Sequence, residues 1–371
     1  MFLTHLQLKN YRNYQELELN FNNQIIIFRG DNAQGKTNIL EAIYLLALAK
    51  SHRTSKEKEL VQWDHSFSVI RGSVKTNRGK TNLEIQLNSK GKKVKINNLE
   101  KRKLSEYIGS FNVVMFGPED LTLVKGSPQH RRKFLDIEIG QVSPTYIYNL
   151  SQYQKIIQQR NNLLKDFSLE KKNKTELLEI WDSQLIDYGA KIIAKRLHFI
   201  KMLENWAKEV HAGITSIQEE LTIQYKSSFA LTNDQELDIK ENFYQVLLKN
   251  RQQEISRGLT LFGPHRDDLL FYINSIDVQT YGSQGQQRTT ALSLKLAEIE
   301  LINEIVGEYP ILLLDDVLSE LDQTRQTQLL KTIEQKVQTI ITTTSTEGIN
   351  LTYLEKYSIF NVINGNVISE E

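Results

Sequence analysis

Two motifs at opposite ends of the chain constrain its fold more than any other feature. Residues 30–37 read GDNAQGKT and match the phosphate-binding pattern GxxxxGKT. Residues 311–316 read ILLLDD, an apolar run ending in two acids, which usually completes the same nucleotide site. Most of the chain lies between these motifs. We therefore expect both ends to form one ATPase core, with another segment inserted between them.

The glycine-containing motif lies in the setting that a phosphate loop requires. Residues 24–28 form a β-branched apolar run that predicts a buried strand, and residues 38–49 are rich in helix formers. The loop amides can then converge on phosphate oxygens where the helix begins. Lys36 would neutralise β- and γ-phosphate charge, and the Thr37 hydroxyl would bind Mg²⁺. The expected ATP ligands here are Gly30, Asp31, Asn32, Ala33, Gln34, Gly35, Lys36, Thr37 and Asn38.

The acidic motif predicts the second half of the site. Residues 311–314 indicate a buried strand, and Asp315 follows at its carboxyl end, where α/β folds place their ligands. We expect Asp315 to lie beside Mg²⁺ and Asp316 to position or activate the attacking water. A capped strand end is the simpler alternative for two adjacent acids, but the phosphate loop favours the functional interpretation.

Composition narrows the class of protein. The chain has no cysteine, which excludes disulfides and cysteine-based metal centres. No run approaches the roughly 18 apolar residues that a membrane helix needs, so we expect a cytoplasmic protein without a membrane partner. The net charge is +1, so binding to nucleic acid would depend on local basic patches.

Two stretches of alternating apolar and polar residues predict strands. The first covers residues 1–28 and contains a candidate hairpin turn at residues 10–13, and the second covers residues 67–96. Short apolar runs of the kind found in parallel sheets occur again at residues 311–314 and 339–341. These segments predict the sheets of an α/β head.

A helical pattern occupies the middle of the chain, from residue 146 to residue 257. Residues 176–211 contain no proline and predict one long amphipathic helix, with Asn173 as its cap. We therefore expect a head of mixed sheets and flanking helices, and a helical arm inserted into it. The expected division is a head of residues 1–125 and 258–371, and an insertion of residues 126–257.

A second anion-binding device precedes another helix. Residues 281–290 read YGSQGQQRTT and a long helical stretch follows, so Ser283 and Gly285 lie at a helix N-terminus. Serine is also a favoured helix cap, which is the simpler alternative. Two phosphate cradles for one nucleotide indicate that the second one serves the ATP of a neighbouring copy.

These motifs resemble the ABC/SMC-type ATPase superfamily. Residues 283–287 are similar to the ABC signature motif, residues 319–322 to the D-loop, and residues 6–14 to the opening of SMC-type heads. The resemblance implies a P-loop ATPase head in which Arg12 and Asn13 contact the nucleotide. It also implies an ATP-dependent homodimer. The residues expected to act on the neighbour's ATP are Ser283, Gln284, Gly285, Gln286 and Asp322.

The chain as a whole resembles the RecF family of bacterial DNA replication and repair proteins. The resemblance rests on stretches that include FGPEDL at 116–121, GPHRDD at 263–268 and LLDDVLSELD at 313–322. It implies sequence-independent binding to duplex DNA or to junctions of single and double strands. It further implies recruitment of RecO and RecR and help in loading RecA at single-strand gaps. Two alternatives are a dimerising scaffold with negligible hydrolysis and a transporter-type energising subunit.

Departures from the superfamily pattern predict slow ATP hydrolysis. Asp316 stands where transporter ATPases generally have Glu, and the switch His corresponds roughly to Thr343 or Thr344. A threonine can hydrogen-bond the γ-phosphate but cannot act as an imidazole would. We expect Lys36, Asp316 and Thr344 to be the catalytic residues. Glu119 is only a weak counterpart of the Q-loop glutamine.

Basic clusters are the candidates for DNA contacts. Phosphate binding is mainly electrostatic and independent of sequence, so such clusters suit a duplex or junction binder. The alternative for each cluster is a solvated loop or an ion pair, such as Arg131 with Asp136 or Glu138. The candidate residues are Arg53, Lys56, Lys92, Lys93, Arg131, Arg132 and Lys133.

Overall fold

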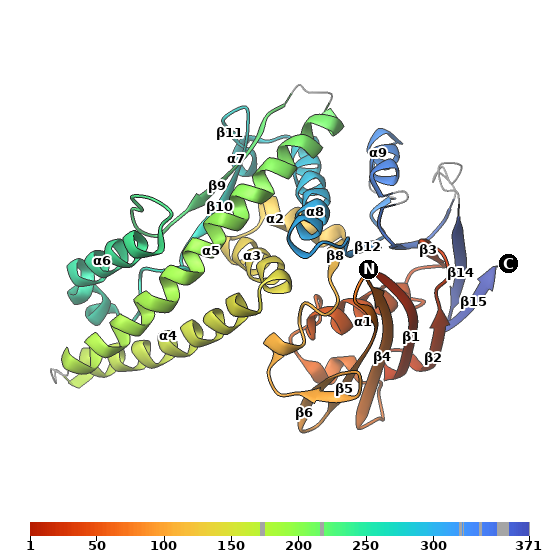
Figure 1. The fold of residues 1–371 in the computed structure, drawn as a ribbon, viewed down its shortest axis with the longest axis horizontal. Coiled ribbons are helices and arrows are strands. Elements are labelled where there is room, and N and C mark those ends of the chain that lie inside the picture. The colour runs from red at the N-terminus through yellow and green to blue at the C-terminus, as the bar shows by residue number, and fades with distance from the viewer. Residues whose placement is uncertain are drawn as a thin grey trace. The chain divides into compact units, whose positions relative to one another are not determined.

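The computed structural model describes residues 1–170, 175–215, 219–318, 321, 323–333, 336–346 and 356–370. The chain forms two compact units, one made of residues 1–120 and 292–371 and the other of residues 121–291. The first unit thus joins the red-to-orange and the blue parts of the chain (Figure 1). The second unit contains residues 126–257 and extends to Ala291.

A six-stranded sheet forms the base of the first unit, in the order β15-β14-β3-β13-β12-β8. Strands β14, β3, β13, β12 and β8 are parallel, and only β15 runs antiparallel to its neighbour β14. Apolar and β-branched residues let these central strands be buried on both faces. Their bounds are β3 Ile25–Arg29, β8 Val113–Phe116, β12 Ile311–Asp315, β13 Thr339–Thr343, β14 Tyr357–Ile363 and β15 Asn366–Glu370.

An antiparallel sheet forms the second layer of this unit, in the order β2-β1-β4-β5-β6-β7. The expected N-terminal hairpin is confirmed, because β1 pairs with β2 across a turn at Arg12 and Asn13. The alternating stretch at 67–96 is likewise confirmed as strands. The bounds are β1 Phe2–Tyr11, β2 Tyr14–Asn20, β4 Phe67–Thr76, β5 Gly79–Asn88, β6 Gly91–Ile96 and β7 Leu99–Lys101.

Helix α1 (Lys36–Leu48) lies between the two sheets and contacts β13 of one and β4 of the other. Nearly the whole helix is buried, 11 of its 13 residues, including Leu40 and Ile43. A helix that is apolar on all sides is what a core position requires. The other elements of this unit are η1 Glu57–Leu60, η2 Leu104–Glu106, η3 Pro118–Asp120 and α9 Gln323–Ile333.

The second unit is built around three long helices that pack on one another, α4 (Pro144–Glu170), α5 (Thr175–Thr215) and α6 (Glu236–Arg257). The predicted long helix is confirmed, since α5 has 41 residues. Its predicted cap, Asn173, lies outside the described residues. The shorter helices are α2 Leu121–Lys125, α3 Pro128–Val142 and α7 Val278–Tyr281, and α8 Gln284–Val306 begins here.

The expectation of an entirely helical pattern across residues 146–257 is wrong at one place. Strand β9 (Leu221–Lys226) pairs with β10 (Asp268–Ile273), and β11 (Ile276–Asp277) completes a three-stranded sheet. Leu221 and Ile223 alternate with polar residues, a period of two that fits a strand with one buried face. The long helical pattern around this short run concealed it.

Buried ion pairs hold the second unit together. Arg160 is fully buried and donates to Asp182 over 2.7 Å and to Glu254 over 2.6 Å. Arg196 donates to Asp136 over 2.7 Å and to the carbonyl of Pro264. Removing one partner of such a pair leaves an uncompensated charge, so these contacts fix how the helices pack on the segment 260–268. Among the described residues, no helix is long and apolar enough to cross a membrane.

Candidate nucleotide-binding site

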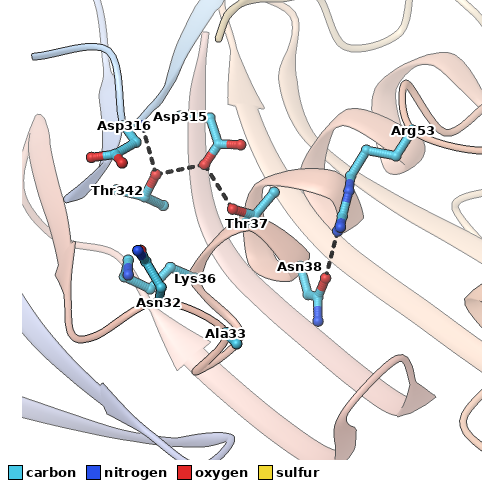
Figure 2. A pocket seen from close by; sticks show the side chains of 10 residues that line it. Asn32, Ala33, Lys36, Thr37, Asn38, Arg53, Asp315, Asp316 and Thr342 are labelled. Carbon is cyan, nitrogen blue, oxygen red and sulfur yellow. Dashed lines mark hydrogen bonds between the residues drawn. The ribbon is translucent and has the colours of Figure 1, made fainter. Parts of the chain in front are cut away.

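The parallel sheet brings the two sequence motifs together. Strand β13 lies between β3 and β12, so the phosphate loop after β3 and the acids after β12 meet at the same edge. The Thr37 hydroxyl donates to Asp315 Oδ1 over 2.9 Å. Thr342, the register partner of Asp315, donates to the same oxygen over 2.7 Å. Both hydroxyls point at Asp315 in Figure 2.

A cavity of about 350 Å³ opens at this edge. It is lined by residues of the phosphate loop, of the first turn of α1 and of the end of β12 (Figure 2). Gly35 precedes α1 with φ of 116°, a conformation that favours glycine, and the first residues of α1 line the cavity. The lining residues are Asn32, Ala33, Gly35, Lys36, Thr37, Asn38, Arg53, Asp315, Asp316 and Thr342.

Two cations line this cavity, Lys36 and Arg53, and Lys36 belongs to the phosphate loop itself. Its ammonium donates to the carbonyls of Gly30, over 2.5 Å, and Asp31, over 2.8 Å. Burial lowers the pKa of Lys36, and the negative charges of Asp316 and Asp315 partly oppose that shift. The Lys36 ammonium is thus held beside two carbonyls and near two acids. Its positive charge is suited to binding an anionic ligand, whose negative charge would balance it.

Asp316, the residue that follows β12, has an uncommon backbone conformation. Its φ is 52°, in the left-handed region. Its amide donates to the carbonyl of Thr342 over 3.2 Å and to the Thr342 hydroxyl over 3.1 Å. Non-glycine residues in this region concentrate at functional sites, where the surrounding structure holds them. The turn directs Asp316 away from the strand and into the lining of the cavity.

Among residues 342–344, the one that lines the cavity is Thr342, which sequence reasoning missed. The expected residue, Thr344, is exposed, and the hydroxyl of Thr343 donates to the carbonyl of Ser345 over 2.7 Å. The five residues of β13 alternate in direction, so only the register with β12 identifies the hydroxyl that meets Asp315. A run of three threonines carries no signal in the sequence that would select Thr342.

Arg12 lies against a buried carboxylate. Its guanidinium donates to both oxygens of Glu41, over 2.8 and 2.7 Å, and Glu41 is fully buried. Ser51 also donates to Glu41, over 2.5 Å. Burial alone would raise the pKa of Glu41, but hydrogen bonds from Arg12 and Ser51 outweigh it and lower that pKa. This cluster joins the N-terminal hairpin to α1, the helix that follows the phosphate loop.

A second cavity, of about 460 Å³, shares Asn38 and Arg53 with the first one. Arg53 donates to Asn38 over 2.8 Å and therefore stands at the boundary of both cavities. Trp63 lines the second cavity and is 90% exposed. The complete lining is Arg12, Asn13, Asn38, Arg53, Glu59, Val61, Gln62 and Trp63. Sequence reasoning missed Trp63, although an indole in a polar loop is itself a signal.

The signature segment belongs to the second unit. Ser283 accepts a hydrogen bond from the amide of Gln286 over 3.2 Å, and Gln286 Oε1 accepts one from the amide of Ser283 over 3.0 Å. This reciprocal pair is a capping box at the start of α8. Ser283 and Gln284 are exposed, and Gly285 is half-buried. Of the expected D-loop, Ser319, Glu320 and Asp322 lie outside the described residues.

The candidate DNA residues divide into paired and exposed ones. Arg131 is 2% exposed and its guanidinium is bidentate to Asp268, not to Asp136 or Glu138, while Arg132 donates to the carbonyl of Asp267. Lys92 donates to Glu57 over 2.7 Å and to the carbonyl of Ala49 over 2.6 Å. The exposed members are Arg53, which is 3.6 Å from Glu41, Lys56, which is 3.6 Å from Glu59, Lys93, which is 3.6 Å from Glu100, and Lys133.

The donor set beside Lys36 fits Mg²⁺. Thr37 Oγ1 and Asp315 Oδ1 are hard oxygen atoms on adjacent elements, and Mg²⁺ takes oxygen ligands. No group of three or more acidic or histidine side chains in the described part of the chain could hold a metal alone. That agrees with a Mg²⁺ site of this type, because the ion is bound by one or two protein oxygens together with phosphates and water.

Comparison with known proteins gives the family. Residues 2–366 match the family of RecF/RecN/SMC N-terminal domains. The DNA replication and repair protein RecF of Bacillus mycoides (strain KBAB4) is 56% identical over 371 residues, which cover 100% of this chain and 99% of that protein. The chain belongs to the RecF family. RecF of Bacillus cereus (strain B4264) is similar to the same extent, 56% over 371 residues with the same coverage.

Solved structures agree with membership of the RecF family. The chain is similar to a structure of the recombination mediator protein RecF-ATP in the RecFOR pathway, with a TM-score of 0.92, 37% identity, and coverage of 100% of this chain and 98% of that one. A Pyrococcus furiosus Smc head domain matches with a TM-score of 0.56 and 15% identity, covering 100% and 96%, and so shares the fold alone. The predicted ABC/SMC-type head and the RecF resemblance are thereby confirmed.

Proposed function

We propose that this protein is an ATP-dependent DNA-binding protein of recombinational repair and replication restart. Two copies would pair head to head on DNA when ATP is bound, and slow hydrolysis would release them. The observation that carries the proposal is the contact of Thr37 with Asp315, which makes one oxygen-lined nucleotide cavity from both motifs. Relatives with the name RecF are DNA replication and repair proteins, and a RecF-ATP structure is similar to this chain.

Each residue of the cavity would have its own role in hydrolysis. Lys36 and the loop amides would hold the β- and γ-phosphates, and Thr37 and Asp315 would hold Mg²⁺. Bound Mg²⁺ would supply charge neutralisation at the phosphates. Asp316, directed into the cavity by its left-handed turn, would orient the attacking water. Thr342 stabilises this arrangement, because it bonds both the Asp315 carboxylate and the Asp316 amide.

The second cavity would take the base and the ribose. It adjoins the phosphate cavity through Asn38 and Arg53, so a nucleotide whose phosphates lie on α1 can extend into it. The exposed indole of Trp63 offers a flat apolar face on which a purine can stack. Arg12 and Asn13 both line this cavity, and the Arg12 guanidinium is also bonded to Glu41. Both residues would therefore contact the nucleotide, and Glu41 would hold Arg12 in place.

The signature segment is the part of the chain that supports the proposed dimer. Ser283 and Gln284 are exposed where α8 begins, and free helical amides at that point favour an anion. Ser283, Gln284, Gly285 and Gln286 would bind the γ-phosphate of a neighbouring copy. The capping box of Ser283 and Gln286 does not exclude this, because a capping serine keeps a lone pair and a proton for a ligand.

DNA and protein partners complete the proposal. Exposed Lys56, Lys93 and Lys133 would contact phosphates of duplex DNA or of a junction, without reading sequence. By its relation to RecF of the RecFOR pathway, the protein would recruit RecO and RecR and so help to load RecA. It would act in the cytoplasm, in association with the nucleoid.

The test of the function is a sedimentation-velocity series with ATP, ADP and duplex DNA at several salt concentrations. ATP should convert monomer to dimer, ADP should not, and DNA should bind with an affinity that falls as salt rises. Lys36→Ala should bind no ATP and stay monomeric. A wild-type protein that remains monomeric with ATP and DNA would reject the proposal.

A further inference from the structure

Gln34, inside the phosphate loop, turns its side chain away from the phosphate cavity. Its Oε1 accepts a hydrogen bond from the amide of Asn364 over 2.6 Å, and its carbonyl accepts one from the amide of Gly365 over 3.2 Å. Asn364 and Gly365 form the turn of the β14–β15 hairpin, with φ of 49° and 77°. The cavity lining on either side of Gln34 includes Ala33 and Gly35 but not Gln34.

The N-terminal hairpin holds the same part of the loop from another direction. Asn13 Nδ2 donates to the carbonyl of Gln34 over 3.2 Å, and the Tyr14 hydroxyl donates to the carbonyl of Gly35 over 3.0 Å. A Cβ at Gly365 would lie 3.3 Å from Asn13, so the two hairpins also approach each other closely. The phosphate loop is therefore fastened on its outer side by two hairpins from distant parts of the sequence.

Fastening the carbonyls determines where the amides point. The peptide unit is planar and trans, so the N–H of one residue points opposite to the C=O of the residue before it. When the Gln34 carbonyl is held outward by Gly365 and Asn13, the Gly35 N–H is directed inward. The same argument applies to the Gly35 carbonyl and the Lys36 N–H. Amides that are already directed at a phosphate need no reorganisation when it binds.

The hairpin itself is anchored to the strand that leads into the loop. Arg29, the last residue of β3, donates to Asn361 over 3.0 Å and pairs with Glu370. A Cβ at Gly30 would lie 2.3 Å from the carbonyl of Val362, so β14 also lies directly against the start of the loop. The β14–β15 hairpin therefore contacts the phosphate loop at both its first glycine and its fifth residue.

We propose that Gln34 is a positioning residue that fastens the phosphate loop to the C-terminal β14–β15 hairpin and so pre-organises the loop amides for ATP. This rests on the proposed function, because it assumes that the loop binds ATP. Gln34 then acts through Gly35 and Lys36 and touches no phosphate itself. The turn at Asn364 and Gly365 becomes part of the nucleotide site, although neither residue lines the cavity.

The experiment is a double-mutant cycle across this contact. Gln34→Met keeps the length of the side chain and removes the acceptor, and Gly365→Val strains the left-handed turn from the other side. Each single variant should weaken ATP and ADP binding about five- to tenfold, roughly the loss of one hydrogen bond. The double variant should be no weaker than the single ones, because both substitutions release the phosphate loop from the same turn. The KM for ATP should rise while kcat stays within about twofold.

A matched control is available in another hairpin of the same unit. Gly79 lies in the β4–β5 turn with φ of 114° and has no atom within 4 Å of its Cβ position. Gly79→Val strains a hairpin turn in the same way and should leave ATP binding unchanged. Hydrogen exchange gives a second readout, since ATP should slow exchange at residues 362–366 in the wild type and less in Gln34→Met. This readout keeps the test decisive if Gly365→Val fails to fold.

The outcomes separate this proposal from the proposed function. If the wild type binds no ATP, or Lys36→Ala binds as well as the wild type, the nucleotide site itself is wrong. If those two behave as expected but Gln34→Met binds ATP within twofold of the wild type, only the fastening role is rejected. Independent losses that multiply in the double variant would also reject it.

Discussion

Thr37 and Asp315 are 278 residues apart in the chain, yet the Thr37 hydroxyl lies 2.9 Å from Asp315 Oδ1. This contact exists because β13 alone separates β3 from β12 in the sheet, so their carboxyl ends meet. The cavity is thus a product of tertiary structure, because its lining combines residues of both motifs.

Removal of the Thr37 hydroxyl should uncouple Mg²⁺ from ATP. In Thr37→Val the side chain keeps its shape but loses the metal ligand, so Mg²⁺ should no longer tighten ATP binding, and hydrolysis should fall about 100-fold or more. Titrations with ATP in Mg²⁺ and in EDTA measure the difference. Thr343→Val, which removes a buried hydroxyl bonded to Ser345, is the control and should behave like the wild type. An unchanged Mg²⁺ effect in Thr37→Val would contradict the assignment.

Asp316→Asn should keep ATP binding and lose turnover. The amide cannot orient and accept a proton from water as a carboxylate does, and general-base losses are typically about 10²- to 10⁴-fold. ATP-bound dimers should then persist, which size-exclusion chromatography over time can measure. If dimer lifetime is unchanged, ATP serves only to join the two copies, and a scaffold with negligible hydrolysis becomes the better account.

Trp63 should show directly whether the base of ATP binds in the second cavity. Trp63→Ala should weaken ATP binding about tenfold, as expected when an aromatic stacking partner is removed, while tripolyphosphate binding stays unchanged. The other tryptophans, Trp181 and Trp206, lie in α5 of the second unit. In a Trp181→Phe, Trp206→Phe background, ATP should therefore quench the remaining fluorescence and tripolyphosphate should not. Equal quenching by both ligands would place the base elsewhere.

The second unit should lose stability in mild acid through His265. Burial, with Arg266, Arg132 and Arg160 nearby, lowers the pKa of His265 to about 4, although its bond to the Thr260 carbonyl opposes the shift. Because that carbonyl only accepts, Nε2 carries the proton, and Nδ1 accepts from the Tyr153 hydroxyl over 2.9 Å. The neutral ring is therefore the form that fits the folded protein.

The sign of this effect follows from the lowered pKa. The unfolded chain binds a proton near pH 6.5 that the folded chain does not bind until about pH 4. The stabilisation is fully present above pH 6.5 and is lost as the pH falls from 6.5 to 4, by up to about 3 kcal/mol. Thermal unfolding of the wild type and of His265→Gln across this range measures it. Parallel pH profiles would show that the pKa of His265 is the same in the folded and the unfolded chain.

The parts of the site that could be predicted are those that local sequence determines. The phosphate loop, its strand and its helix follow from residues 24–49, and the acids follow a run that could only be a buried strand. Glu41, Trp63 and Thr342 were not predicted, because their roles depend on what lies opposite them in the folded chain. Glu41 reads as an ordinary polar residue in a helix, until the structure places Arg12 against it.

The strands, too, could be predicted from the sequence only in part. The parallel strands were visible as apolar runs, but their order was not, and the order decides that β13 supplies Thr342 to Asp315. Strand β9 was hidden because six residues of alternation stand between α5 and α6, and its partner β10 is distant in sequence. Non-local pairing leaves little trace in the residues that make it.

We propose that a working site needs the phosphate loop of one copy and the signature segment of another. Lys36→Ala removes the first and Ser283→Arg blocks the second. Each of the two blocked variants alone should hydrolyse almost no ATP. Mixed in equal amounts, they form a heterodimer with one intact composite site, so about a quarter of wild-type activity should return if copies pair at random. A mixture no more active than its components would contradict the account.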